Sequence, residues 1–246
     1  MSIAIACQDV QFNNIAAVIF DKDGTLENSG AYWRMVGSER ARLIDARIPG
    51  VGEPLMMAFG IADDTINSQG LMAVGSRTEN EIAAAAYIAE TGKSWHESLD
   101  MARSAFDEVA ESKYLIKTPR TAPLYDDVRE TLKSLNHRGL KIGILSADST
   151  KATEKFVAEH ELDDYVQICV GTDGTVIKPD PQLYLKTCQG LGLPPKQTIL
   201  VGDSAVDMIM TKAAKAAAAV GICRQQNLVL DSADVLIKSL YEIHAL

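Results

Sequence analysis

The sequence has no long apolar run. No stretch reaches the roughly 18 apolar residues that a membrane-spanning helix needs, and no basic start precedes an apolar segment of signal-peptide length. We therefore expect a soluble, cytoplasmic protein without a membrane partner.

Cysteine is scarce and positive charge is in deficit. Cys7, Cys169, Cys188 and Cys223 are scattered with no C-x-x-C spacing, so we expect reduced thiols that mostly pack in the interior. Lys and Arg number 24 against 33 Asp and Glu, a formal net charge of −9, which argues against a nucleic-acid partner. An anionic substrate would therefore need local cations or a metal ion.

Clear strand patterns are missing between residue 29 and about residue 118. This stretch is rich in helix formers, as in 79–90 (ENEIAAAAYIAE) and 95–113. Ser76 and Glu79 have the spacing of a capping box, which predicts a helix start. Residues 29–118 are therefore expected to form an all-helical insert.

From about residue 121 onward, short apolar runs alternate with helical patterns. Strands are predicted at 141–147, 165–170, 198–202, 217–222 and 233–237, and helices at 126–137, 150–160, 181–191 and 205–216. This alternation predicts a parallel sheet covered on both faces, with 18–20 as a central strand and 3–12 as an edge strand turning at Asn13-Asn14. The expected fold is a doubly wound α/β core (1–28 and 119–246) with a helical cap domain (29–118) over the carboxyl ends of the strands.

Residues 18–26, VIFDKDGTL, end an apolar strand with two aspartates one residue apart. Because side chains in a strand alternate between faces, Asp21 and Asp23 are expected to project the same way and Lys22 the other. Gly24 permits a turn, and Thr25 adds a hydroxyl. A catalytic site can use one carboxylate as nucleophile and the other as proton carrier, beside a divalent cation. The alternative is an ordinary Asp-Gly turn.

Other polar groups follow other predicted strands. They are Ser146 in I-L-S-A, Lys178 in I-K-P-D-P, and Asp203 with Asp207 in V-G-D-S-A-V-D. Singly, each has a plain alternative: a turn residue for Ser146, a solvated lysine for Lys178 and a helix N-cap for Asp203. Equivalent ends of parallel strands share one edge, however, so we expect these groups to converge with the aspartate pair.

Through the motifs D-K-D-G-T, L-S-A, K-P-D-P and G-D-S-A-V-D, the sequence resembles the haloacid dehalogenase (HAD) superfamily from about residue 15 to the end. The resemblance implies a Rossmann-like core with a cap inserted between the first and second motifs. It is similar to members of the phosphoglycolate phosphatase and β-phosphoglucomutase type, and a small phosphorylated metabolite is the implied partner.

The resemblance implies a metal-assisted reaction at the aspartate pair. Asp21 would attack phosphorus and form an aspartyl-phosphate, with Asp23 as acid and base. Two unit charges at 4 Å repel by roughly 4 kcal/mol at an effective dielectric near 20, so a cation is needed between phosphate and carboxylate. Asp21, Asp203 and the Asp23 backbone carbonyl suit Mg²⁺, with Asp207 in an outer position.

Phosphate binding is implied for the second and third motifs. Lys178 would neutralise Asp21 and hold a phosphoryl oxygen, while the Ser146 hydroxyl and nearby backbone N–H groups such as that of Ala147 would bind the others. In the cap, the segment with Gly75, Ser76 and Arg77 resembles one that contacts substrate in some capped members. The alternative for Arg77 is an exposed arginine in a first helical turn.

Asp23 narrows the chemistry within the superfamily. Dehalogenases and phosphonate-cleaving members lack an acid at this position, so the sequence favours a Mg²⁺-dependent phosphatase acting on a small monoester, a phosphoglycolate-like metabolite or a sugar phosphate. A phosphomutase of the β-phosphoglucomutase type stays open, as does a non-catalytic binding protein on the same scaffold. Monomer and homodimer also both stay open.

Overall fold

The computed structural model describes residues 2–63, 65–67, 70–172, 174–224 and 230–246. The chain divides into two compact units. One is an α/β unit, Met1–Asn28 with Leu124–Leu246, and the other is a mainly helical unit, Ser29–Pro123. The role of the helical unit as a cap stays a prediction.

The α/β unit is built on a six-stranded parallel sheet. In spatial order its strands are β10 (Val235–Ile237), β9 (Ala218–Ile222), β8 (Thr198–Gly202), β3 (Ala17–Phe20), β6 (Lys141–Leu145) and β7 (Ile168–Val170). The strands β3, β8 and β9 are buried along their whole length, because both faces of the sheet are covered. The expected parallel sheet is confirmed, with β8 at its predicted bounds and β6, β7, β9 and β10 shorter than predicted.

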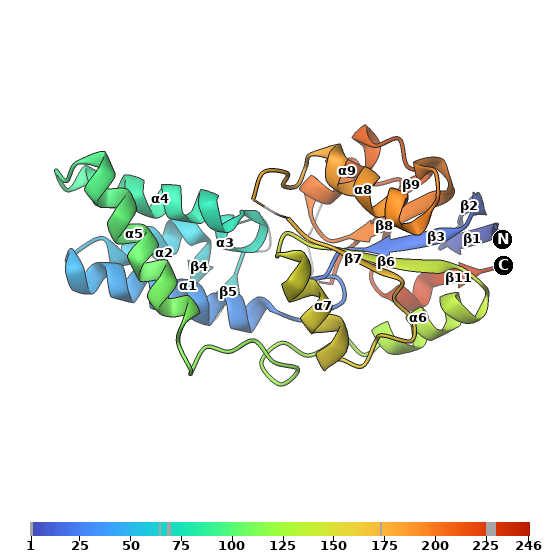
Figure 1. Ribbon diagram of the computed structural model, residues 1–246, viewed down its shortest axis with the longest axis horizontal. Coiled ribbons are helices and arrows are strands. Elements are labelled where there is room, and N and C mark those ends of the chain that lie inside the picture. The colour runs from blue at the N-terminus through green and yellow to red at the C-terminus, as the bar shows by residue number, and fades with distance from the viewer. Residues whose placement is uncertain (1, 64, 68–69, 173, 225–229) are drawn as a thin grey trace. The chain divides into compact units, whose positions relative to one another are not determined.

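Helices cover both faces of this sheet (Figure 1). The helices α6 (Val128–His137) and α7 (Thr150–Glu159) lie on one face, and α8 (Pro181–Leu191) and α9 (Ala205–Ala213) lie on the other. Each face has its own apolar core: Leu132 and Phe156 belong to one, Tyr184 and Met208 to the other. Short 3-10 turns are formed by η1 (Pro195–Gln197) and η2 (Leu240–Glu242). The doubly wound α/β class is therefore confirmed.

The strand order reverses between β3 and β8. From β3 the chain continues outward through β6 and β7, and it then returns to the other side of β3 for β8, β9 and β10. In open α/β sheets a ligand binds outside the carboxyl ends of the strands at such a reversal. Asp21 directly follows β3 and Asp203 directly follows β8, so both stand at this point.

A second sheet joins the two ends of the chain. It is antiparallel, with the order β11 (Ile243–Ala245), β1 (Ile3–Cys7) and β2 (Val10–Ile15). The prediction of one strand over 3–12 turning at Asn13-Asn14 is wrong. The chain turns instead at Gln8 and Asp9. The strand β1 also pairs with the C-terminal strand β11, which the sequence pattern did not predict.

The helical unit contains α1 (Gly30–Arg47), α2 (Gly52–Phe59), α3 (Leu71–Val74), α4 (Arg77–Glu90) and α5 (Trp95–Ala110). The predicted capping box of Ser76 and Glu79 is present at the start of α4. The all-helical expectation is wrong in one detail, because β4 (Ile61–Ala62) and β5 (Thr65–Ile66) form a small antiparallel pair. In the described ranges of both units, no helix has the length and apolar character needed to cross a membrane, and the four cysteines form no disulfide.

Candidate active site

The first motif forms a tight turn at the end of β3. The backbone N–H of Asp21 donates to the carbonyl of Val201 on β8 at 2.9 Å, which holds Asp21 at the sheet edge. The chain then folds back on itself, since the N–H of Leu26 donates to the carbonyl of Lys22 at 2.9 Å and that of Gly24 to the carbonyl of Glu27 at 2.9 Å. The turn predicted at Gly24 is therefore present, and it sets the two aspartates on a closed loop rather than on a continuing strand.

Gly24 lets a carboxylate approach the backbone of this turn. Its φ is +75°, and a Cβ built on it would lie 2.0 Å from Oδ2 of Asp203. A side chain at position 24 would thus collide with Asp203 and also strain the backbone. The two motifs pack so closely that only glycine fits between them.

Three carboxylates converge at the reversal point. Asp21, Asp203 and Asp207 each offer an oxygen, and these oxygens lie within 4.8 Å of one another. Asp207 comes from the first turn of α9, where the hydroxyl of Ser204 caps the helix and also donates to the Asp207 carboxylate. The N-cap alternative for Asp203 is wrong, because Ser204 is the N-cap of α9.

Lys178 joins this cluster from the loop between β7 and α8. Its ammonium contacts the carboxylate of Asp21 and lies 2.7 Å from Oδ1 of Asp207. Only 7% of the lysine side chain is exposed, so the alternative of a solvated lysine is wrong. The expected convergence of Asp21, Lys178, Asp203 and Asp207 is present in the structure.

Burial makes the charge of this cluster costly. Burial raises the pKa of Asp21 to about 7; Lys178 opposes the shift and Asp207 reinforces it. Burial and the neighbouring carboxylates Asp21 and Asp207 also raise the pKa of Asp203 well above its usual range. Burial lowers the pKa of Lys178, but Asp207 and Asp21 more than compensate and raise it. One ammonium among three carboxylates, two of them buried and that of Asp203 partly buried, leaves an excess of negative charge, an arrangement suited to a divalent cation.

Ser146 follows β6 at the same edge of the sheet. Its backbone N–H donates to the carbonyl of Val170 at 2.9 Å, and its buried hydroxyl accepts from the N–H of Asp148 at 3.1 Å. Ala147 between them is exposed. A turn residue would make this same hydrogen bond, so that alternative stays open. The Ser146 hydroxyl also lies at the carboxyl edge of the sheet, where the motif predicts it.

Lys22 lies where the sequence did not predict. Instead of pointing away from the aspartates, its ammonium contacts the carboxylate of Asp23 and lies 2.9 Å from Oδ2 of Asp148. Side chains alternate only within a strand, and β3 ends at Phe20, so the alternation rule does not reach position 22.

Arg77 lies in the helical unit, in the first turn of α4. Its guanidinium is 2.7 Å from Oε1 of Glu81 and 2.5 Å from Oδ1 of Asp107, and 45% of its side chain is exposed. Its donors therefore already serve two carboxylates within that unit.

A further ion pair supporting the first motif was not predicted. Arg224 follows β9, donates to the carbonyl of Thr25 at 2.7 Å, and pairs with Asp127 at the start of α6. The strand prediction for 217–222 puts Arg224 just after a strand end, but it does not indicate its partners. Asp127 carried no local signal, because its other partners, Ser239 and Leu240, are more than a hundred residues away.

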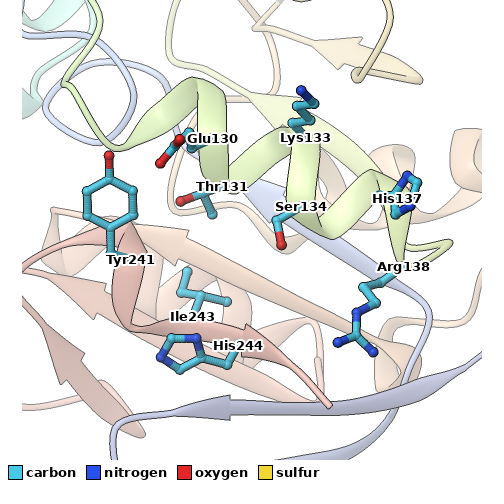
Figure 2. Close-up of a pocket in the computed structure, with 9 residues that line it drawn as sticks. All are labelled: Glu130, Thr131, Lys133, Ser134, His137, Arg138, Tyr241, Ile243 and His244. Atoms are coloured by element: carbon cyan, nitrogen blue, oxygen red, sulfur yellow. The ribbon is translucent and has the colours of Figure 1, made fainter.

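A cavity of about 560 Å³ lies elsewhere in the α/β unit, between α6 and β11. Figure 2 shows its lining, which includes Ser134, Arg138, Tyr241 and His244. Among the described residues that line it, Glu130 is the one carboxylate, so this lining does not supply the paired acids of the predicted chemistry. We therefore do not assign the reaction to this cavity.

Comparison with known proteins agrees with this geometry. A family model described as haloacid dehalogenase-like hydrolase matches residues 15–215. A phosphoglycolate phosphatase of Yersinia pestis is 29% identical over 211 residues, which cover 83% of this chain and 80% of that protein.

Solved structures share the fold. A predicted phosphoglycolate phosphatase from Haemophilus somnus superposes with a TM-score of 0.66 at 21% identity, covering 93% of this chain and 96% of that one. A putative β-phosphoglucomutase from Thermotoga maritima gives a TM-score of 0.60 at 18% identity, with coverage of 93% and 96%. With its sheet, its four motifs and its matching family model, the chain belongs to the haloacid dehalogenase-like hydrolases and is an enzyme of the phosphatase kind.

Proposed function

We propose that this protein is a Mg²⁺-dependent phosphatase of the cytoplasm that hydrolyses a small phosphate monoester, a phosphoglycolate-like metabolite or a sugar phosphate. The observation that carries the proposal is the convergence of Asp21, Asp203 and Asp207 within 4.8 Å, with Lys178 bound to the first and last of them. A turn or a plain structural ion pair would need no third carboxylate at this place.

The donor set fits Mg²⁺. Carboxylate oxygens are the ligands this ion prefers, and the excess negative charge of the buried cluster favours a cation. Asp21 and Asp203 would hold it with the backbone carbonyl of Asp23, while Asp207, already bound by Lys178 and Ser204, would support it from outside. When bound, the ion reduces the repulsion between the substrate phosphate and Asp21.

Asp21 is the proposed nucleophile. One of its carboxylate oxygens forms a bond to phosphorus while the bond from phosphorus to the ester oxygen breaks, which leaves a phosphoryl group on Asp21. Asp23 gives a proton to the departing alcohol. Water then attacks phosphorus while the bond from phosphorus to the Asp21 oxygen breaks, Asp23 takes the proton of that water, and inorganic phosphate leaves with the Asp21 carboxylate restored.

The remaining motif residues would hold the phosphate. Lys178 is placed to bind a phosphoryl oxygen as well as Asp21, and the Ser146 hydroxyl and the backbone N–H of Ala147 would bind others. Arg77 is also proposed to contact the substrate, although its guanidinium already pairs with Glu81 and Asp107.

The test is phosphate release from a panel of monoesters, 2-phosphoglycolate and hexose phosphates among them, with and without Mg²⁺. We expect Mg²⁺-dependent release that is lost in Asp21→Asn. No release from any member of the panel would refute the phosphatase. Isomerisation of a hexose 1-phosphate without net release would establish a phosphomutase instead.

A further inference from the structure

Lys22 is a buried cation to which the proposed reaction assigns no role. Its residue is 1% exposed, and its ammonium faces three carboxylates: it contacts Asp23 and lies 2.9 Å from Asp148 and 3.3 Å from Glu27. A lysine ammonium has three N–H donors. The number of donors thus equals the number of carboxylate partners.

Such a group is costly to bury unless each charge is compensated. The three surrounding carboxylates supply that compensation and hold the pKa of Lys22 well above its usual value against the effect of burial. The ammonium also lies 5.7 Å from the centre of the Phe156 ring. A side chain such as methionine would fill the space but would remove the ammonium that Asp23, Glu27 and Asp148 share.

Contacts of Glu27 and His160 hold one side of the charge cluster formed by Lys22 and its three carboxylates. Glu27 is buried, with Oε2 toward Lys22 and Oε1 at 3.7 Å from Nε2 of His160. The His160 ring in turn packs on Phe156, with 4.8 Å between ring centres. The backbone N–H of Glu27 also donates to the carbonyl of Lys22 at 2.9 Å. The lysine is therefore held in one place.

Lys22 connects two loops of the catalytic edge. Asp23 belongs to the turn of the first motif, and Asp148 belongs to the loop after β6, where its N–H donates to the hydroxyl of Ser146. We propose that Lys22 is a positioning residue that holds the Asp23 carboxylate ready for proton transfer and ties it, through Asp148, to the phosphate-binding loop. This inference rests on the proposed phosphatase reaction.

Leaving groups that differ in basicity test the inference. An alkyl phosphate needs a proton on its departing oxygen, whereas 4-nitrophenyl phosphate releases a stable anion and depends little on the acid. We expect Lys22→Met to lower kcat/KM about 100-fold for the alkyl monoester that the wild type hydrolyses best, and less than about 5-fold for 4-nitrophenyl phosphate. Lys22→Arg should fall between wild type and Lys22→Met. Equal losses on both substrates would overturn the inference, because partial unfolding or weaker phosphate binding lowers both alike.

A double mutant asks whether Lys22 acts through Asp23. In an Asp23→Asn background, adding Lys22→Met should change the alkyl kcat/KM less than about 3-fold, since the acid is already gone. Full additivity of the two losses would overturn the inference.

Lys141→Met is the matched control. This lysine begins β6, at the opposite end of the parallel strands, and its ammonium donates to the backbone carbonyl of Leu191. The ratio of kcat/KM for the two substrates should therefore not change.

The outcomes separate this inference from the proposed function. If the wild type hydrolyses no phosphate ester with Mg²⁺, the proposed function fails. If it does and the ratio of the two kcat/KM values stays constant in the variants, only the role of Lys22 fails. Should Lys22→Met not fold, Lys22→Arg carries the test, and a ratio equal to that of the wild type would then reject the inference.

Discussion

At the scale of single residues, Gly24 allows the Asp203 carboxylate to lie directly against the backbone of the first motif. We expect Gly24→Ala to lower Mg²⁺-dependent kcat/KM by about 100-fold, because its Cβ would displace the Asp203 carboxylate, and a shift of about 1 Å has that order of effect. The left-handed backbone adds a stability cost of about 1 kcal/mol. Steady-state kinetics and thermal unfolding measure the two effects.

Gly139→Ala is the matched control for that substitution. Its φ of +82° is similar, but a Cβ there would meet nothing within 4 Å. It should show the same stability cost with activity unchanged. Equal losses of activity in both variants would show that backbone strain, and not the approach of Asp203, explains the effect.

Ser204 links the N-terminus of α9 to a carboxylate of the candidate site. We expect Ser204→Ala to cost about 1 kcal/mol of stability and also to reduce activity, because the hydroxyl both caps α9 and donates to Asp207. Ser94→Ala removes the N-cap of α5 and should cost similar stability without loss of turnover at a temperature where both variants are folded. Unchanged turnover in Ser204→Ala would mean that Asp207 needs no such support.

At the scale of the elements, Asp127 fastens the start of α6 to two distant segments. It pairs with Arg224 and accepts hydrogen bonds from Ser239 and the N–H of Leu240. Removing its charge leaves the guanidinium of Arg224, which is only 10% exposed, without this ion-pair partner. We expect Asp127→Asn to cost about 3 kcal/mol at neutral pH, measured by urea unfolding, whereas the exposed neighbour Asp126→Asn should stay within about 0.5 kcal/mol of wild type.

Asp127 also makes the folding stability depend on pH. Burial raises the pKa of Asp127, but hydrogen bonds from Arg224, Ser239 and Leu240 outweigh it and lower the pKa from its usual 3.8. A carboxyl with a lowered folded pKa stabilises the protein above the unfolded value and loses that contribution as pH falls through the folded one. The difference in stability between wild type and Asp127→Asn should therefore narrow below about pH 3.8. A constant difference down to pH 3 would contradict this account.

Local patterns predicted the elements of the sheet better than the contacts between distant segments. Buried runs such as TILVG at 198–202 identify themselves by composition, and the proline and glycine that flank 181–191 mark a helix whose bounds the structure matches. The sheet of β1, β2 and β11 was missed, because pairing of Ile5 with Ala245 depends on where the whole chain places its ends. Asp127 and Arg224 were missed for the same reason.

At the scale of the whole molecule, the candidate site at the carboxyl edge of the parallel sheet brings together groups from both sequence segments of the α/β unit. The motif order predicted that Asp21, Lys178, Asp203 and Asp207 would meet, since parallel strands share one edge. It could not predict the direction of Lys22, because that depends on where β3 ends and on Glu27 and Asp148 being beside it.

Binding of Mg²⁺ should raise the unfolding temperature of the protein. Mg²⁺ that binds only the folded protein raises stability by about 2.7 kcal/mol at a concentration 100 times its Kd. We expect Mg²⁺ to raise the Tm of the wild type and of the exposed-site control Asp231→Asn, but not that of Asp203→Asn. An equal shift in Asp203→Asn would place the ion elsewhere.

The central claim is that Asp21 carries the phosphoryl group during turnover. The most direct measurement is an acid quench of the enzyme during hydrolysis of its best monoester with Mg²⁺, followed by peptide mapping by mass spectrometry. We predict one added phosphoryl group on the peptide that contains Asp21, and none in Asp21→Asn. A phosphoryl group on another residue, or turnover that persists in Asp21→Asn, would contradict the account.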